Sequence, residues 1–446
     1  MIVCNLNLWK ACLHIYALIL SAIRRDCNTG NGQIFGEAPP FGKTGRRFAL
    51  YINFRLHYNW ICYDKQTFTS RGLLMKKVTT ADLKRINRSN IFKLIYTERQ
   101  ISKKAIAERL QLSLPPVTQC LKELEEMQLV EKNGLFESSG GRKARVIRCA
   151  RESRVAVGVE VLTDRVEIVA ADLYGGILGE ERHALPYGNT RDYYRRLGGF
   201  VDSFLLSARV PPERVLGVGV AVQGLVSADG RLVTYSKLLD CAGASLESFG
   251  EFIRFPCKLV HDAEAAALAE LWFSGDITDA VYLSLSKNLG GAVILNSRLY
   301  KGRGNGSGLI EHMVIEPGGR PCYCGKKGCL EAYCSTTALT GGGDLETFFA
   351  ALRARKPRET ERWGRYLGNL ALAVDNLHLL LDCTVILGGH IVPFLTDGDL
   401  CRLNTLLREK NPFPDRRDYV RVGKCSHAVV ATGAALLFTS DFLRCV

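Results

Sequence analysis

The chain has 446 residues, 47% of them apolar and 23% charged, and a formal net charge of +14. This is ordinary globular composition, with length for about two or three domains and a buried core. Of its sixteen cysteines only four cluster, and the others are scattered in apolar or helical contexts. That distribution excludes the disulfide framework of a small secreted domain and favours reduced thiols in the cytosol.

The excess of basic over acidic side chains lies entirely in the first third of the chain. Residues 1–74 carry a net charge of +6 and residues 75–150 a net charge of +8, whereas residues 151–446 balance 34 basic against 34 acidic side chains. A basic segment joined to a neutral one is typical of a nucleic-acid-binding module fused to another domain. A merely basic surface is the alternative interpretation of the charge alone.

Residues 1–74 have no clear structural period. The apolar run Ala11–Ile23 is too short for a membrane span, and no small-residue cleavage pattern follows it. Met75 opens a stretch that resembles a natural protein start. We therefore expect residues 1–74 to be an over-extended gene start and not a functional segment.

Residues 75–150 have the pattern of a helix-turn-helix domain. Apolar spacing predicts a helix over Leu83–Glu98, and Ser102 is a plausible N-cap for the next one. Ser113 is placed to cap a third helix, whose first turn accommodates two prolines. That helix would bury Val117, Leu121 and Leu124 and present Thr118, Gln119 and Lys122 outward, toward base edges.

A glycine-rich turn follows between two short apolar segments and predicts a β-hairpin. Such a wing would place Arg142, Lys143 and Arg145 against phosphates or in a minor groove. With the helices before it, the hairpin predicts a winged helix-turn-helix that binds double-stranded DNA. A helical subdomain used for protein contacts is the alternative.

From residue 151 onward, predicted strands and helices alternate. The β-branched and apolar runs predict strands over Val155–Val161, Val166–Leu173, Val215–Val222, Lys258–Val260, Ala280–Leu285, Gly291–Asn296 and Val385–Leu387. A helix should follow His261 and Asp262. Glycine-rich turns close several of these strands, which is where ligands bind in α/β proteins.

The stretch from His312 to Cys334 holds the most specific motif. Cys322, Cys324 and Cys329 have C-x-C-x-x-x-x-C spacing, and a histidine stands ten residues upstream of the first cysteine. Three thiolates and one imidazole form a standard structural zinc set. The intervening glycines let the backbone turn tightly enough to aim the sulfurs at one point. Core cysteines without a metal are the alternative.

Residues 79–446 resemble a transcriptional regulator of the ROK family (repressors, open reading frames and sugar kinases). The resemblance rests on LKRINRSNI, LSLPPVT, SSGGR, HDAEAAALAE, YKGRGNGSGLIEHM, CYCGKKGCLE and ILGG. It implies an actin-like, ribonuclease-H-like α/β fold of two lobes behind the winged helix. By position it implies the metal ligands His312, Cys322, Cys324 and Cys329, with Cys334 as a fallback. It implies the sugar-site residues His261, Asp262, His312 and Glu331, of which Asp262 matches the catalytic aspartate of the kinases.

The chain departs from the family kinases at three turns. Where they have Asp-x-Gly-Gly-Thr, this chain has Glu160 at the acidic position and Leu162 and Thr163 in place of the glycines. The second phosphate turn is eroded to SKNLGG. In the Gly-Glu-x-Gly-His turn, Leu309 replaces the glutamate and Glu311 the second glycine. Side chains in a phosphate cradle obstruct its close approach to phosphate, so we expect no kinase activity and no catalytic residues.

The sequence therefore predicts a cytoplasmic transcriptional regulator, a repressor of carbohydrate-utilisation genes that binds an operator as a homodimer or tetramer. Its effector would be a sugar or sugar derivative bound in an altered, catalytically inactive site. The domains would be the leader 1–74, the DNA-binding domain 75–150 and the effector domain 151–446. A ROK sugar kinase, or a regulator that senses a protein partner, are the alternatives.

Overall fold

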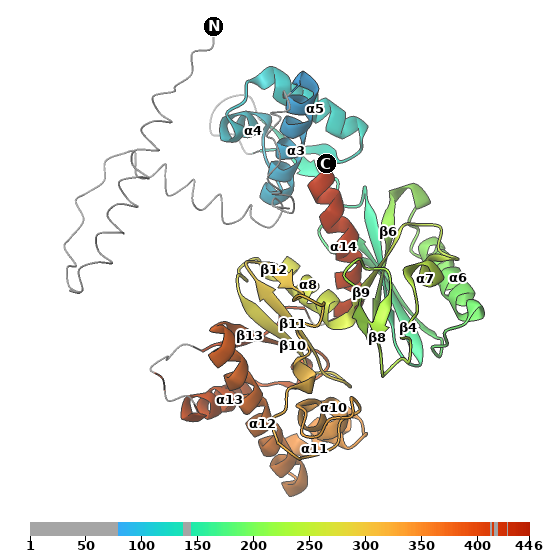
Figure 1. Ribbon diagram of the computed structural model, residues 1–446. Helices are drawn as coiled ribbons and strands as arrows, with labels where there is room; N and C mark the ends of the chain where they lie inside the picture. Colours follow the sequence, from blue (N-terminus) through green and yellow to red (C-terminus); the bar gives the residue numbers. More distant parts are fainter. Residues whose placement is uncertain (1–78, 137–143, 411–412, 414–417, 426) are drawn as a thin grey trace, which may run out of the picture. The chain divides into compact units, whose positions relative to one another are not determined.

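The computed structural model describes residues 79–136, 144–410, 413, 418–425 and 427–446. The expectation for residues 1–74 falls outside these ranges. The described chain begins with three helices and a hairpin of two antiparallel strands (Figure 1). These are α3 (Thr80–Glu98), α4 (Lys103–Leu110), α5 (Leu114–Glu126), β1 (Val130–Leu135) and β2 (Arg145–Cys149).

Local capping explains where the first helices begin. Thr79 and Asp82 form a capping box at the start of α3, and the Ser102 hydroxyl accepts a hydrogen bond from the Ala105 N–H, as predicted. Ser113 is the N-cap of α5 by backbone conformation, but its side chain makes no capping hydrogen bond. The expected cap from Ser113 is therefore wrong in its chemistry. Proline at the start of α5 reduces the number of N–H groups that need a partner.

The winged helix has its own core and also packs on the rest of the chain. Val117, Leu121 and Leu124 of α5 are buried, as their spacing predicted. The same apolar cluster includes Leu443 and Val446 at the end of the chain. The winged helix is therefore held against the last residues of the chain by shared apolar burial.

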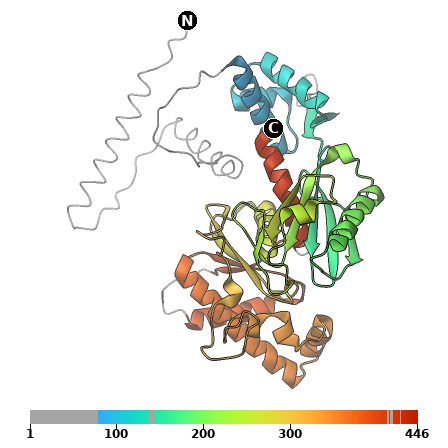
Figure 2. The same cartoon turned by 45° about the vertical axis from the view of Figure 1, so that its right-hand side comes forward.

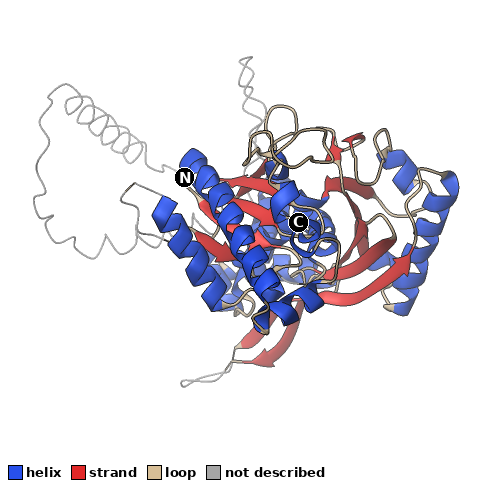
Figure 3. Ribbon diagram, turned by 90° about the horizontal axis from the view of Figure 1, so that it is seen from below, coloured by secondary structure: helices blue, strands red, loops and turns tan. Residues whose placement is uncertain are grey.

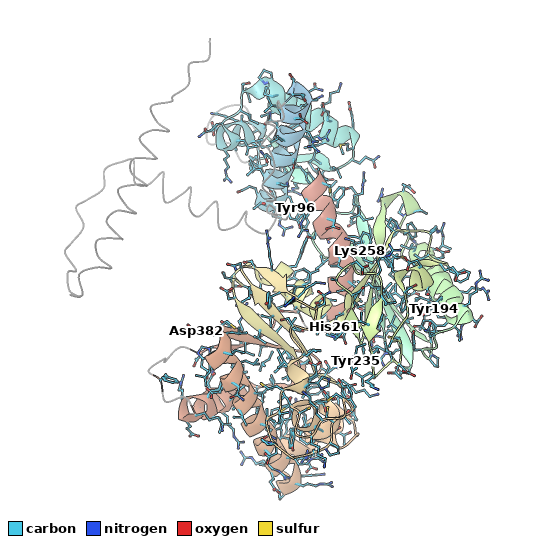
Figure 4. The ribbon with its side chains drawn as sticks, viewed as in Figure 1. Tyr96, Tyr194, Tyr235, Lys258, His261 and Asp382 are labelled. Carbon is cyan, nitrogen blue, oxygen red and sulfur yellow. The ribbon has the colours of Figure 1, made fainter. Side chains whose placement is uncertain are left out.

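Polar and aromatic contacts add to this junction. The Tyr96 hydroxyl of α3 donates to the Leu173 carbonyl at 2.8 Å, and the Tyr96 and Tyr174 rings stack at 4.5 Å (Figure 4). The Arg99 guanidinium lies 3.5 Å from the centroid of the Tyr174 ring. Stacked rings under a cation give this contact a defined geometry as well as burial.

The next part of the chain forms a mixed five-stranded sheet in the order β5-β4-β3-β6-β9. Strands β3, β4 and β5 are antiparallel, and β6 and β9 run parallel to β3. Helix α6 (Arg191–Ser207) packs on this sheet, followed by the short hairpin β7–β8 and α7. The bounds are β3 Val155–Val161, β4 Arg165–Asp172, β5 Ile177–Ala184, β6 Val215–Val222, β7 Leu225–Val226, β8 Val233–Tyr235, α7 Leu246–Gly250 and β9 Cys257–His261.

A second five-stranded sheet has the order β12-β11-β10-β13-β14. Strands β10, β11 and β12 are antiparallel, and β13 and β14 run parallel to β10. The strands are β10 Ala280–Ser284, β11 Gly290–Leu295, β12 Arg298–Tyr300, β13 Thr384–Gly388 and β14 Val420–Val422. The helices are α8 Asp262–Ser274, α9 Glu331–Cys334, α10 Thr336–Thr340, α11 Leu345–Arg353, α12 Pro357–Leu381, α13 Asp397–Lys410 and α14 Val429–Cys445.

The two sheets share one topology, which confirms the predicted two-lobed actin-like fold. In each sheet the middle strand comes first in the sequence. The next two strands form a meander on one side of it, and two strands that run parallel to it lie on the other side. Helices lie on either side of the strands (Figure 3), as expected for sheets with parallel pairs. Among the described residues no helix is both long and apolar enough to cross a bilayer.

Helix α14 lies alongside the first sheet in both views (Figures 1 and 2) and rests directly on backbone. A Cβ added at Gly158 of β3 would lie 1.7 Å from the Ala431 carbonyl oxygen, and one at Gly219 of β6 would lie 2.1 Å from the Ala434 carbonyl oxygen. On the other side of the helix, a Cβ at Gly433 would lie 1.8 Å from the Ala265 carbonyl oxygen of α8. Only glycine permits these approaches.

We expect Gly433→Ala to destabilise the protein, because the added methyl must push α14 away from α8. Overpacking of this kind costs about 1–3 kcal/mol or more. For a chain of this size, that lowers Tm by roughly 1 °C per kcal/mol in a thermal unfolding scan. Gly199→Ala, on the exposed face of α6 with open space around it, is the matched control and should leave Tm equal or slightly higher. Equal melting of the two variants would contradict this account of α14.

Candidate functional site

The four predicted metal ligands meet at one point. His312 lies in a 3-10 turn (Ile310–His312), and the three cysteines lie in the loop before α9. One ligand atom from each of the four lies within 4.8 Å of all the others. The Cys324 and Cys329 sulfurs are 3.8 Å apart, and the His312 Nδ1 is 3.6 Å from the Cys322 sulfur. A tetrahedron with metal–sulfur distances of about 2.3 Å has edges close to these lengths.

The loop reaches this shape through isolated bridges and two glycines. Val314 pairs with Cys329, and Pro321 pairs with Lys327. Gly325 and Gly328 have φ values of +93° and +82°, in the region that favours glycine. A Cβ at Gly328 would also lie 1.8 Å from the Glu316 carbonyl oxygen. The four residues could therefore hold a metal ion in a backbone framework that is already folded.

Cys334, the fallback ligand, lies apart from this group. It is fully buried, and its thiol lies 3.9 Å from the Tyr366 carbonyl oxygen. Burial raises the pKa of the Cys334 thiol well above its ordinary value, so it behaves as a core side chain. The alternative ligand set that used Cys334 in place of His312 finds no support in this geometry.

A small cavity of about 40 Å³ lies beside the metal-ligand group. Three of the four predicted sugar-site residues line it: His261, Asp262 and His312. Figure 4 labels His261 and Tyr235, which contribute to its wall from β9 and β8. The remaining lining residues are Gln223, Gly224, Leu225, Ser236, Lys237, Leu238, Asn288, Leu289, Leu309, Glu311 and Tyr323.

Asp262 begins α8 and is held by neighbours on both sides. Its Oδ1 accepts a hydrogen bond from the Ala263 N–H at 2.7 Å and lies 3.1 Å from the His261 Nε2. Burial raises the pKa of Asp262, and the adjacent His261 opposes this rise. His261, and not Asp262, is the N-cap of α8. The Asp262 carboxylate nevertheless accepts a hydrogen bond in the first turn of the helix.

Glu331, the fourth predicted sugar residue, does not line the small cavity but contacts two residues of its wall. It is buried at the start of α9, and its two oxygens accept hydrogen bonds from the Asn288 amide at 3.0 Å and the Leu289 N–H at 2.7 Å. Asn288 and Leu289 themselves line the cavity. Glu331 therefore positions the wall of the cavity from behind. Burial also raises its pKa.

A larger cavity of about 770 Å³ adjoins the small one, and the walls of both include Asp262, Gln223 and Asn288. Its wall includes the two turns that depart from the kinase pattern, with Leu162 and Thr163 in one and Ser286 to Asn288 in the other. Burial, and then the charges of Glu167 and Asp262, raise the pKa of Glu160 to about 8. Side chains at both turns obstruct the close backbone approach that a phosphate cradle needs.

The predicted DNA-contacting face lies on the exposed side of α5. Thr118, Gln119 and Lys122 are exposed, and so is Ser113 just before the helix. Gln119 donates a hydrogen bond to Glu123, and Lys122 pairs with Glu126, both within α5. Arg145 is exposed at the start of β2. Arg142 and Lys143 lie outside the described residues.

A family model places this arrangement among known proteins. The model described as "ROK family" matches residues 156–440. The chain belongs to the ROK family. A second model, described as "Winged helix-turn-helix DNA-binding", matches residues 85–131, which include α4, α5 and most of α3.

Curated relatives match at modest identity. The chain is 27% identical to a xylose repressor of Caldicellulosiruptor bescii over 261 residues, which are 58% of this chain and 65% of that protein. It is 29% identical over 260 residues to the "DNA-binding transcriptional dual regulator NagC" of Escherichia coli, covering 58% of this chain and 64% of that protein. The chain thus spans just under two thirds of the length of these relatives.

Solved structures agree on the fold. The crystal structure of a ROK family transcriptional regulator, described as a homologue of the E. coli MLC protein, matches with a TM-score of 0.65 at 21% identity. It covers 81% of this chain and 97% of that one. A ROK family glucokinase from Streptomyces griseus, in complex with glucose and AMPPNP, has a TM-score of 0.56 at 21% identity and covers 64% and 98%. At these identities the likeness establishes architecture alone.

Sequence reasoning noted Glu311 only as a replaced glycine and did not include it in the site. In the structure it is 5% exposed and lines the small cavity. The available signal was its place beside His312 in a turn that carries a metal ligand. An acidic residue there is costly to bury and therefore informative.

Glu160 gives a pH-dependent prediction. Between pH 4.5 and about 8 the folded protein holds a proton on Glu160 that the unfolded chain releases, so this group makes stability fall as pH rises. Glu160→Gln removes that contribution. The variant should gain Tm relative to the natural chain as pH increases from 5 to 8. Glu152→Gln, which alters an exposed carboxyl, is the control and should give a constant difference. A constant difference for Glu160→Gln as well would refute the shift.

Proposed function

We propose that this chain is a DNA-binding transcriptional regulator, a repressor of carbohydrate-utilisation genes controlled by a sugar or sugar derivative. The observation that carries the proposal is the exposed face of α5, where Thr118, Gln119 and Lys122 stand outward in a winged helix joined to a ROK domain. A helix of this kind fits the major groove of B-DNA. The two curated relatives described above, a xylose repressor and a DNA-binding dual regulator, support this proposal.

The proposed functions of the two domains follow the distribution of net charge along the chain. Residues 75–150, with a net charge of +8, form the DNA-binding domain, and the neutral residues 151–446 form the effector domain. The protein binds a double-stranded operator in the cytoplasm as a homodimer or tetramer, because a two-fold protein matches two half-sites. A sugar in the cleft changes DNA affinity only if it binds the two states of the protein unequally.

We propose that the ROK domain senses its ligand without catalysis. Leu162 and Thr163 occupy the turn where a phosphate cradle needs glycine, and Glu160 adds a buried acid to the same cavity. A ROK sugar kinase is the second candidate, favoured by Asp262, which lines both cavities as a general base should. A regulator that senses a protein partner is the third.

We propose zinc as the metal held by the His312, Cys322, Cys324 and Cys329 group. The donor set is three sulfurs and one imidazole nitrogen, and all four positions of a tetrahedron are filled by protein. Such a closed set suits structural zinc and leaves no position for a reacting water. Its role would be to fix the loop that carries one wall of the small cavity.

The DNA-binding proposal predicts distinct effects for different side chains of α5. Genomic fragments captured by the full chain supply the probe, whose affinity is measured by fluorescence anisotropy at several salt concentrations. Gln119→Ala should weaken binding to the captured sequence by about 1–3 kcal/mol and relax its specificity. Lys122→Ala, which removes a cation as well as a predicted base-edge contact, should weaken binding to the captured sequence more than to unrelated DNA and reduce the salt slope.

Arg358→Ala removes the same charge from the exposed surface of α12 and is the control, with no expected change. If Lys122→Ala and Arg358→Ala bound the captured DNA equally, α5 would not be the contacting helix. Failure of the natural chain to enrich any genomic fragment would refute the DNA-binding proposal.

The metal proposal predicts about one zinc ion per chain in protein purified without chelator, measured by elemental mass spectrometry. Cys329→Ser should remove the metal, because the variant loses one of three thiolates. Cys401→Ser, which changes an exposed cysteine of α13 far along the chain, should retain it. Metal retained by His312→Ala and lost from Cys334→Ser would instead show that Cys334 takes the place of His312.

A further inference from the structure

Glu311 is a buried carboxyl group, and one of its oxygens has no hydrogen-bond partner among the described residues. The residue is 5% exposed, and its Oε2 is buried without a donor. Its Oε1 lies 3.9 Å from the His312 Nε2, beyond hydrogen-bond length. A buried carboxyl oxygen without a partner costs free energy, so its presence needs an explanation.

The other acidic residues at this cavity are already engaged. Asp262 accepts a bond from the Ala263 N–H and faces His261, and Glu331 accepts bonds on both oxygens from Asn288 and Leu289. Glu311 Oε2 is therefore a buried acceptor in the wall that remains without a partner among the described residues. A ligand that enters the cavity with hydroxyl or amine groups would find its strongest free acceptor there.

Leu309 differs from Glu311 in what its side chain can bind. It lines the same cavity two residues earlier in the same turn, and its side chain can accept no hydrogen bond. The turn thus presents one apolar and one acidic side chain to the cavity, and the acidic one directly precedes the metal ligand His312. The position of the carboxylate in this turn decides which part of a ligand it can reach.

We propose that Glu311 binds the effector directly, by accepting a hydrogen bond from a hydroxyl or amine of a polyhydroxylated ligand. This inference rests on the proposed function, which supplies a sugar-type effector for the cavity. It also defines the chemical class. Asp262 and Glu311 line the wall, so a ligand that donates hydrogen bonds from hydroxyl or amine groups fits it.

The size of the cavity constrains how the ligand enters. A volume of about 40 Å³ holds roughly one water molecule and not a sugar ring. The adjoining cavity of about 770 Å³ shares Asp262, Gln223 and Asn288 with it. The ligand therefore binds with the two cavities opened toward each other, and Glu311 receives the end of the ligand nearest the metal loop.

The test is calorimetric titration of the full, metal-containing chain with single compounds. The panel contains neutral pentoses and hexoses, hexosamines, hexose phosphates and uronic acids. We expect binding by a neutral or amino sugar. Glu311→Gln should weaken that binding several-fold to about tenfold, the loss expected for one hydrogen bond. Glu316→Gln, an exposed glutamate five residues on, is the control and should bind as the natural chain does.

A second readout keeps the outcomes distinct. Metal content is measured for each variant, since Glu311 adjoins His312. Unchanged affinity in metal-containing Glu311→Gln would overturn the inference. No binding of any sugar by the natural chain would overturn the proposed effector class itself.

Discussion

The contact on which the rest of the fold depends is the packing of α14 directly against backbone. Gly158 and Gly219 remove side chains from the sheet where the helix crosses it, and Gly433 removes one from the helix where α8 crosses it. At these three points the helix therefore meets the backbone of the first sheet and of α8 directly. Contacts this close leave little room for sliding, so α14 and the elements it touches move as one body.

This rigidity connects two regions far apart in function. The first residues of α14, Val429 and Val430, line the larger cavity. At its other end Leu443 lies in the core of the winged helix, and the Phe442 ring meets Phe92 of α3 edge-on at 6.5 Å. A change of lobe angle around the cavity would therefore reach the DNA-binding helices through a single helix. Such coupling needs two discrete arrangements that the effector distinguishes, and not merely an intervening path.

Elements fixed by local chemistry could be predicted from the sequence. The strand Val215–Val222 and the buried stripe of α5 follow directly from apolar spacing, and the cysteine spacing predicted a cluster that the structure brings together. Contacts between distant residues could not be predicted. Nothing near Glu331 in sequence indicates that Asn288 and Leu289 would engage both its oxygens, and the burial of Glu311 depends on the assembled cavity. The capping hydrogen bond from the Ser113 side chain is absent, because a residue can adopt the N-cap backbone conformation without making that bond.

His312 explains why the metal-ligand group and the small cavity belong together. Its Nδ1 faces the Cys322 sulfur, and its Nε2 faces the Glu311 carboxylate. A ring with one nitrogen bound to a metal has a fixed orientation, so its other nitrogen is fixed as well. The residue next to it is then held in the same turn, with its side chain at the cavity wall. A structural metal can in this way determine which ligand a pocket accepts, although it touches neither the ligand nor any reaction.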